Sequence, residues 1–336
     1  MTTVTCMCLP HSINSSLEAS QSYTAACEID RLPEDLLVRV ISLTSPVDAN
    51  SAAAVSRAFR MAADTDTVWS CFVPRELLRF AKKEISPAPA SKKALFKRLS
   101  CLPAFLPRKL MHMRLDKATG AKCFMLSAET LQITKYQGYV WDWTPLGFDR
   151  NACHSGKRFR HVATFRNCGK IEIRSKIHCK MLSRNVMYAA YMVFKLGPTS
   201  FYGMDYPFQE ASISVGGCGS TSTVCLQSCM EDEGDGDESP RIHVLESPDR
   251  AHRVVRCPRV ITLGEDMVLP RKRADGWMEV ELGEFYNEEG YDDEVYVSLT
   301  ETSLSKKYGL IVLGMEFRNK SQNLTRLQRG SKQSRS

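Results

Sequence analysis

Aromatic and acidic side chains in the C-terminal half are the residues whose types and spacing best suit chemistry on a ligand. Trp141 and Trp143 stand two positions apart, so on a β-strand both indole rings would point to the same face. Glu279 and Glu281 have the same spacing, and two carboxylates near aromatic rings could serve as the acid and base of a glycosidase. These glutamates alternate with apolar residues, which instead predicts the solvated side of a half-buried strand. We therefore expect no catalysis at this pair.

Other catalytic and metal-binding patterns are missing from the sequence. There is no GxSxG turn to hold a nucleophile, and Gly216 to Gly219 lacks the frame of a phosphate-binding loop. The acidic run at 231–238 lacks the ligand spacing of an EF-hand. Three cysteines between 218 and 229 could bind zinc only with a fourth ligand such as His243, and no CxxC pair supports such a site. We expect a protein that is not an enzyme and holds no metal or cofactor.

The composition limits the class of protein and of partner. The chain has 336 residues, 43% of them hydrophobic, which allows two or three domains with real cores. Its net charge of +7 is mild and its basic residues are scattered, so no nucleic-acid partner is expected. No stretch approaches the roughly 18 apolar residues of a membrane span, and residues 1–30 lack the positive charges of a signal or transit peptide. Thirteen cysteines, an odd number, indicate reduced thiols and a location in the cytoplasm or nucleus.

The helix signals of the chain are concentrated in residues 32–74. Leu32 and Pro33, followed by two acids, predict a helix start, and apolar residues then recur with helical spacing at 37, 40 and 41. Ser45-Pro46 predicts a second helix, and Phe59 lies in a third. Three short helices in about 40 residues are at the lower limit for a free-standing core. Such a unit is expected to keep an apolar face for a partner.

From about residue 115 the apolar period changes from that of helices to that of strands. Residues 171, 173 and 177 alternate with charged residues, which predicts a half-buried strand, and 186–196 is expected to form a central strand. Further strands are expected at 124–127, 131–134, 211–215, 278–282, 295–299 and 310–317. Short strands joined by turns predict an antiparallel β-sandwich, and the whole chain is expected to be an α+β protein of several domains.

These patterns divide the chain. The expected parts are a flexible leader at 1–27, the helical unit at 28–74, a helical and proline-rich connector at 75–114, the β-sandwich at 115–318 and a basic tail at 319–336. An acidic, flexible insert is expected inside the sandwich at 216–263, because 231–238 holds six acids in eight residues.

The helical unit resembles the F-box of plant proteins. The motifs that carry the resemblance are Leu-Pro-Glu-Asp at 32–35, Val-Ser-x-x-Phe-Arg at 55–60 and Ala-Ala-Asp-x-Asp-x-x-Trp at 62–69. The resemblance implies docking onto the Skp-family adaptor of an SCF (Skp, cullin, F-box) ubiquitin ligase, and through it onto the cullin. The residues that it implies as adaptor-facing or fold-setting are Leu32, Pro33, Leu36, Leu37, Val40, Ile41, Val55 and Trp69. The alternative is an ordinary helical hairpin whose apolar stripe packs on the rest of this chain.

The β region resembles the phloem protein 2-like (Nictaba-type) lectin domain over about residues 116 to 318. The motifs are KATGAKCFMLSAETLQI at 117–133, WDW at 141–143, IEIRSKIHCKMLSRNVMYAAYMVFKL at 171–196 and DGWMEVELGEFYNEEG at 275–290. The resemblance implies a β-sandwich that binds glycans, typically N-acetylglucosamine oligomers, N-glycan cores or galactose-containing units.

The same resemblance implies a set of sugar-binding residues. An indole ring can pack on the C–H face of a sugar while carboxylates hold its hydroxyl groups. Trp141 matches a binding tryptophan of the family and Trp143 stands beside it, although core packing is the alternative for both. The second family tryptophan is missing here, and Tyr136 is the candidate substitute. The implied carboxylates are Glu279, Glu281 and Glu284.

Together, the two resemblances lead to one main hypothesis and two alternatives. The main hypothesis is a non-catalytic substrate receptor of an SCF ubiquitin ligase, in which the helices bind the adaptor and the sandwich binds a target protein or glycoprotein. One alternative is a cytosolic or nuclear lectin of stress or defence responses. The other is a sandwich that recognises protein rather than sugar.

Overall fold

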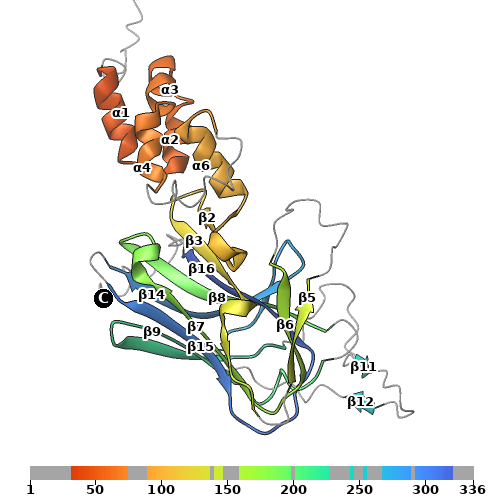
Figure 1. The fold of residues 1–336 in the computed structure, drawn as a ribbon. Helices are drawn as coiled ribbons and strands as arrows, with labels where there is room; N and C mark the ends of the chain where they lie inside the picture. The colour runs from red at the N-terminus through yellow and green to blue at the C-terminus, as the bar shows by residue number, and fades with distance from the viewer. Residues whose placement is uncertain are drawn as a thin grey trace, which may run out of the picture.

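A helical end stands on a two-layered β-sandwich in the computed structural model (Figure 1). The structure describes residues 32–74, 89–136, 140–146, 159–197, 201–227, 243–245, 253–255, 267–288 and 292–320. The expected leader, most of the acidic insert and almost all of the basic tail lie outside these residues. The described helices are α1 (Glu34–Ser42), α2 (Pro46–Ala52), α3 (Arg57–Ala63), α4 (Asp66–Phe72) and α6 (Lys92–Cys101).

Serine caps begin three of these helices. The hydroxyl oxygens of Ser45, Ser56 and Ser91 each accept a hydrogen bond from the backbone N–H three residues later, which satisfies a donor that the first turn leaves free. The expected helices over 32–74 are present. The segment around Trp69 forms an additional one, α4, so this unit has four short helices rather than three.

The helical core is closed by α6, which belongs to the expected connector. Leu37 and Ile41 of α1 pack inward together with Trp69 and Phe72 of α4. Phe96 of α6 joins them, with its ring centroid 5.2 Å from that of Trp69. The connector therefore supplies part of the core of the helical unit.

The predicted antiparallel sandwich is confirmed. Its first sheet has the strand order β1-β2-β3-β16-β8-β14-β13, and the β5–β6 pair joins it through β16. The strands of this sheet are β1 (Ala104–Phe105), β2 (Met111–Leu115), β3 (Lys122–Ser127), β5 (Val140–Pro145), β6 (His161–Asn167), β8 (Val186–Leu196), β13 (Arg271–Lys272), β14 (Met278–Asn287) and β16 (Leu310–Asn319). The long apolar run β8 lies between β16 and β14 at the centre, as its composition predicts.

The second sheet has five strands in the order β10-β9-β15-β7-β4. They are β10 (Cys218–Val224), β9 (Gln209–Val215), β15 (Glu294–Glu301), β7 (Ile171–His178) and β4 (Gln132–Ile133). Strand β10 falls inside the stretch expected as an insert, because its Ser- and Thr-rich sequence shows no apolar alternation. Two short strands of the insert, β11 (His243–Leu245) and β12 (Arg253–Val255), pair with each other.

The two sheets pack through their apolar faces. Ile171, Ile173 and Ile177 of β7 point into the core, and the charged residues between them point out. The two sheets come close together at Gly283, where β14 has an irregular register and φ is +147°. A Cβ atom at Gly283 would collide with the side chain of Ile213 on β9. The β14 backbone can lie this close only because glycine has no side chain.

The turn between β2 and β3 contacts the helices. Gly120, in the turn between β2 and β3, packs against Pro46 of α2 and Phe72 of α4, which would lie 3.4 and 3.5–3.6 Å from a Cβ atom there. One continuous hydrophobic cluster runs from Leu37 in α1 to Phe317 in β16. The two ends of the molecule thus share a core and are fixed relative to each other.

None of the described helices is long and apolar enough to cross a membrane.

Candidate functional sites

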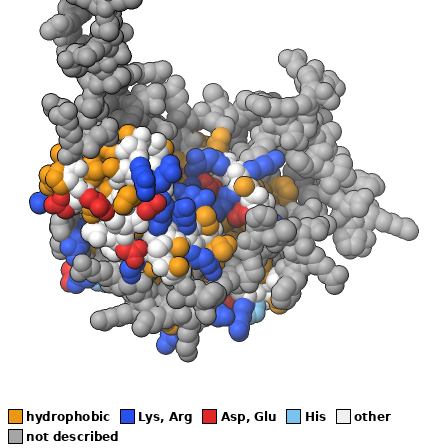
Figure 2. Space-filling view, turned by 90° about the horizontal axis from the view of Figure 1, so that it is seen from above, with side chains coloured by type: hydrophobic (Ala, Val, Ile, Leu, Met, Phe, Trp, Pro, Cys, Tyr) orange, Lys and Arg blue, Asp and Glu red, His pale blue; other side chains and the backbone are white. Residues whose placement is uncertain are grey.

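The first candidate site is an apolar surface on the helical end, which we call the helical docking face. It consists of exposed hydrophobic side chains from α1, α2 and α3 and from the turns beside α1 and α3, namely Leu32, Leu36, Val40, Leu43, Val47, Val55 and Met61. Leu43 is 82% exposed and Val55 is 66% exposed. Figure 2, which looks down on the helical end, shows hydrophobic side chains gathered over these helices. An apolar area of this kind indicates a protein-binding surface.

The structure separates the F-box residues of the sequence into two groups. Leu32, Pro33, Leu36, Val40 and Val55 are exposed and are available to a partner. The remaining three are core residues: Leu37 is 1% exposed, Ile41 is 2% exposed, and Trp69 is fully buried. The indole Nε1 of Trp69 donates a hydrogen bond of 2.7 Å to a backbone carbonyl oxygen in α3. These three set the fold and do not contact solvent.

The expectation that Glu279 lies on a solvated side of β14 is wrong. Its side chain is buried, with 6% of the residue exposed. Two arginines cover it: Arg318 of β16 donates at 2.5 and 2.8 Å, and Arg273, directly after β13, donates at 2.8 Å. Burial opposes ionisation of the carboxyl group, but the hydrogen bond and charge of Arg318 outweigh it and lower the pKa of Glu279. The missed signal is the Arg-Lys-Arg run at 271–273, which supplies cations to this face.

Glu281 and Glu284 are also engaged by neighbours. Glu281 accepts hydrogen bonds from the hydroxyl of Tyr191 at 3.0 Å and from Lys320 at 2.9 Å, and Glu284 pairs with the same lysine. The guanidinium of Arg318 lies over the ring of Tyr191, 3.8 Å from its centroid. The three glutamates thus belong to an ion-pair network on the outer face of the first sheet.

The two tryptophans lie on one face of β5, opposite Phe165 and Ala163 of β6. Trp141 packs against the main core beside Phe165, so its ring is half-buried. Trp143 is 48% exposed. Of the two rings, Trp143 therefore offers the larger accessible surface to a ligand.

Tyr136 lies away from the glutamates, at the edge of the second sheet. Its hydroxyl donates a hydrogen bond of 2.8 Å to Glu172 of β7, and Lys170 lies over its ring. The implied sugar-binding residues are thus distributed over β5, β14 of the first sheet and the β4 edge of the second sheet. The structure does not bring them together in one site.

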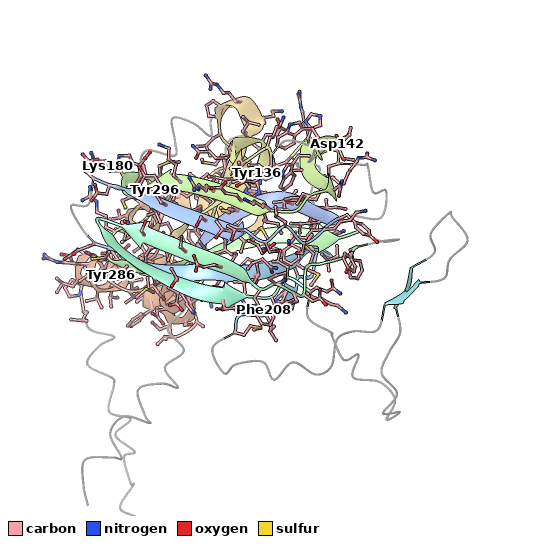
Figure 3. All side chains as sticks on the ribbon, turned by 90° about the horizontal axis from the view of Figure 1, so that it is seen from below. Tyr136, Asp142, Lys180, Phe208, Tyr286 and Tyr296 are labelled. Atoms are coloured by element: carbon pink, nitrogen blue, oxygen red, sulfur yellow. The ribbon has the colours of Figure 1, made fainter. Side chains whose placement is uncertain are left out.

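A second candidate site, which sequence reasoning missed, is an open trough of about 390 Å³ on the outer face of the five-stranded sheet. Its lining comes from β4, β7, β15 and β9 and consists of Gln132, Arg174, Ser175, Lys176, Ser212, Ser214, Tyr296, Val297 and Ser298. Figure 3 looks onto the sandwich from the side of this sheet. It labels Tyr296, which is on β15 next to β7, and Tyr136, which follows β4. The available signal was the serines at the outward positions of β9 and β15.

Beside the trough, two carboxylates each bind one basic side chain and one tyrosine hydroxyl. Glu172 pairs with Arg174 at 2.5 Å and accepts the hydrogen bond from Tyr136. Glu294 accepts hydrogen bonds of 2.8 Å from both Lys176 and the hydroxyl of Tyr296. Hydrogen bonds from Thr134 and Tyr136 lower the pKa of Glu172, and a hydrogen bond from Lys176 lowers that of Glu294. Both carboxylates are therefore ionised and neutralise the cations beside them.

Within the described part of the chain, no group of three or more His, Cys, Asp or Glu side chains is placed to hold a metal ion. The described cysteines, at 71, 101, 123, 168, 179, 218 and 225, are all free. Cys229 and the side chain of His243, the remaining candidates for zinc, lie outside the described residues.

The helical end and the sandwich each match a known family. The family described as F-box-like matches residues 29–75, and the family described as Phloem protein 2 matches residues 121–319. F-box protein PP2-B1 of Arabidopsis thaliana is 33% identical over 321 residues, which cover 90% of this chain and 93% of that protein. F-box protein VBF of the same plant is 32% identical over 86% of this chain and 99% of its own length. The chain therefore belongs to the F-box proteins that carry a phloem protein 2 domain.

Proposed function

We propose that this protein is a substrate-receptor subunit of an SCF-type ubiquitin ligase. The observation that carries the proposal is the helical docking face, on which Leu36, Val40 and Leu43 stay exposed while the neighbouring Leu37 and Ile41 fill the core. An amphipathic helix with a second, solvent-facing apolar side fits a hydrophobic groove on a partner. The Skp-family adaptor is that partner, and it connects the protein to the cullin.

The sandwich is the part that binds the target, which is a protein or a glycoprotein recognised through its glycan. The protein itself does no bond-making chemistry in this proposal. Holding a target near the ubiquitin-charged enzyme makes the transfer nearly intramolecular, so a high effective concentration replaces catalysis by this chain. The shared core of helices and sandwich favours this role, because a fixed joint holds the target at a constant place relative to the adaptor.

We place the protein in the cytoplasm or nucleus, where SCF ligases would meet it. The free thiols among its described residues, both buried and exposed, accord with a reducing compartment.

The test is capture of the purified adaptor by the full-length protein. Replacing Leu36 and Val40 together with Asp puts two charges on the docking face without touching the core, and we expect it to abolish capture. The control is Leu304→Asp, which places one such charge on an exposed leucine in the segment before β16, away from the docking face. Leu37 and Ile41 are unsuitable positions because their replacement would unfold the helices.

Three results are informative. Capture lost only in the double variant supports the ligase role. Capture that survives in the folded double variant contradicts it. No capture by the unmodified protein would leave a lectin or a protein-recognition module that acts outside the ligase.

A further inference from the structure

The outer face of the five-stranded sheet is polar along its central row. The strand register places Gln132, Arg174, Ser298, Ser212 and Thr221 side by side across all five strands. The hydroxyls of Ser212 and Ser298 are hydrogen-bonded to each other at 2.8 Å. A row of this kind offers hydroxyl, amide and guanidinium groups to one ligand.

The neighbouring row of outward-facing residues, two positions along each strand, accounts for the shape of the trough. Lys176, Tyr296 and Ser214 lie side by side in it, so long side chains stand over β7 and β15 and a short one over β9. The long side chains of Lys176, Tyr296 and Arg174 thus stand beside the short side chains of Ser212, Ser214 and Ser298. The resulting volume of about 390 Å³ lies within the range of small-molecule sites, roughly 300–1,000 Å³.

The charges of the trough favour a neutral ligand. Arg174 is paired with Glu172, and Lys176 is paired with Glu294, so each cation already has its counter-charge at hydrogen-bonding distance. An anion would have to displace a carboxylate to reach either cation. A ligand that offers hydroxyl groups can instead add hydrogen bonds to groups that are still half-exposed.

Tyr296 supplies a preformed surface for an apolar ligand face. Its ring is exposed, and the hydrogen bond from its hydroxyl to Glu294 fixes the side chain. An immobilised aromatic ring loses little conformational entropy when a ligand stacks on it. A molecule with hydroxyl groups at its edge and C–H groups on its face matches this combination.

We infer that the trough binds an uncharged oligosaccharide, with a sugar ring stacked on Tyr296 and its hydroxyls bonded to Ser212, Ser298 and Gln132. This site differs from the tryptophan and glutamate set, whose carboxylates are occupied by Arg318, Arg273 and Lys320. The inference rests on the proposed role of the sandwich in target binding, and it specifies where a glycan is held.

The test titrates full-length protein with chitotriose and lactose, and with 3′-sialyllactose as the anionic counterpart of lactose. Ser298→Phe fills the trough, and Thr223→Phe makes the same kind of change at an exposed outward position of β10 that does not line it. We expect at least one neutral sugar to bind the unmodified protein and the Thr223→Phe variant. Binding should weaken at least about tenfold in Ser298→Phe, and about tenfold in Tyr296→Ala, where stacking is lost.

Several results would overturn the inference. The first is that neither neutral sugar binds, and the second is that both trough variants bind as well as the unmodified protein. The third is that sialyllactose binds better than lactose. The fourth is that Trp143→Ala loses binding while both trough variants keep it. If the trough captured a protein target and the neutral sugars did not compete, the ligand of the trough would be a protein surface and not an oligosaccharide. Adaptor capture by the same preparations separates failure at the trough from failure of the ligase role.

Discussion

The ring of Trp69 packs against the ring of Phe96 with their centroids 5.2 Å apart, although the residues come from the F-box and from the segment that follows it. Phe96 also lies 6.4 Å from Phe72, so three aromatic rings meet between α4 and α6. A unit ending near residue 74 would leave this side of Trp69 open to water. The F-box of this protein therefore needs α6 to complete its core.

The first prediction concerns that contact. Phe96→Ala should lower the free energy of unfolding by about 3–5 kcal/mol, because it removes a buried ring and leaves a cavity beside Trp69. Urea unfolding followed by tryptophan fluorescence measures the change. Lys97→Ala, on the exposed side of the same helix, is the control and should change stability by less than about 0.5 kcal/mol. Equal effects of the two substitutions would show that α6 adds nothing to the core.

The second prediction concerns the close contact between the sheets at Gly283 and Ile213. Gly283→Ala should destabilise the sandwich by about 2 kcal/mol or more, because the new Cβ collides with Ile213 across the core. Gly276→Ala is a suitable control, since Gly276 also has positive φ, +77°, but has open space around its Cα. The control carries backbone strain at a positive φ, about 1–3 kcal/mol, without a collision. Thermal unfolding of both variants measures the loss of stability. A smaller loss in Gly283→Ala than in Gly276→Ala would contradict the close packing of Gly283 against Ile213.

Much of the fold could be predicted from the sequence because its signals are local. The serine caps at 45, 56 and 91 and the alternation of Ile171, Ile173 and Ile177 each act within a few residues, and the corresponding helices and strand are present. Strand β10 was missed because its Ser- and Thr-rich sequence has no apolar alternation. Its place is set instead by seven residues of pairing with β9.

The candidate sites were harder to predict because they depend on contacts between distant segments. Alternation placed Glu279 opposite Val280 correctly, but it could not show that Arg318, 39 residues later, covers that outward face. The trough has the same origin, since Arg174, Ser212 and Ser298 become neighbours only when β7, β15 and β9 pair. Helical periodicity likewise grouped Val40 with Leu37 and Ile41, although Val40 is exposed and the other two lie in the core.

The third prediction tests whether the buried glutamate is structural. Glu279→Gln removes one of the two carboxylates that Arg318 and Arg273 share, the other being Glu316. It should lower the free energy of unfolding by about 1.5–3 kcal/mol, because partly buried guanidinium groups lose hydrogen bonds to a charged acceptor. Glu284→Gln, at a more exposed ion pair, should cost less than about 1 kcal/mol. Chemical denaturation measures both. A Glu279→Gln protein as stable as the Glu284→Gln protein would remove the structural role.

The last prediction is a loss of stability in mild acid caused by His112. This side chain lies between Phe105 and Phe159, and its Nδ1 has no hydrogen-bond partner among the described residues. Burial lowers its pKa from 6.5 to about 4; the charge of Glu316 opposes this shift, while those of Arg114 and Arg273 add to it. The unfolded chain therefore takes up a proton below pH 6.5 that the folded chain does not, so stability falls between pH 6.5 and about 4.

From pH 7 to 4.5 this single group should cost about 2–3 kcal/mol. His112→Phe keeps an aromatic ring between its two neighbours and should flatten the profile of unfolding free energy against pH over this range. His161→Phe, at a more exposed histidine, should leave the decline in place. Burial of Glu316 opposes its ionisation, but the charges of Arg273 and Arg114 outweigh the burial and lower its pKa to about 2. Glu316 therefore loses its stabilising charge only as the pH falls from 4.5 towards 2, and the two effects overlap only between about pH 4.5 and 4. Parallel profiles for the unmodified protein and His112→Phe would assign the decline to other groups.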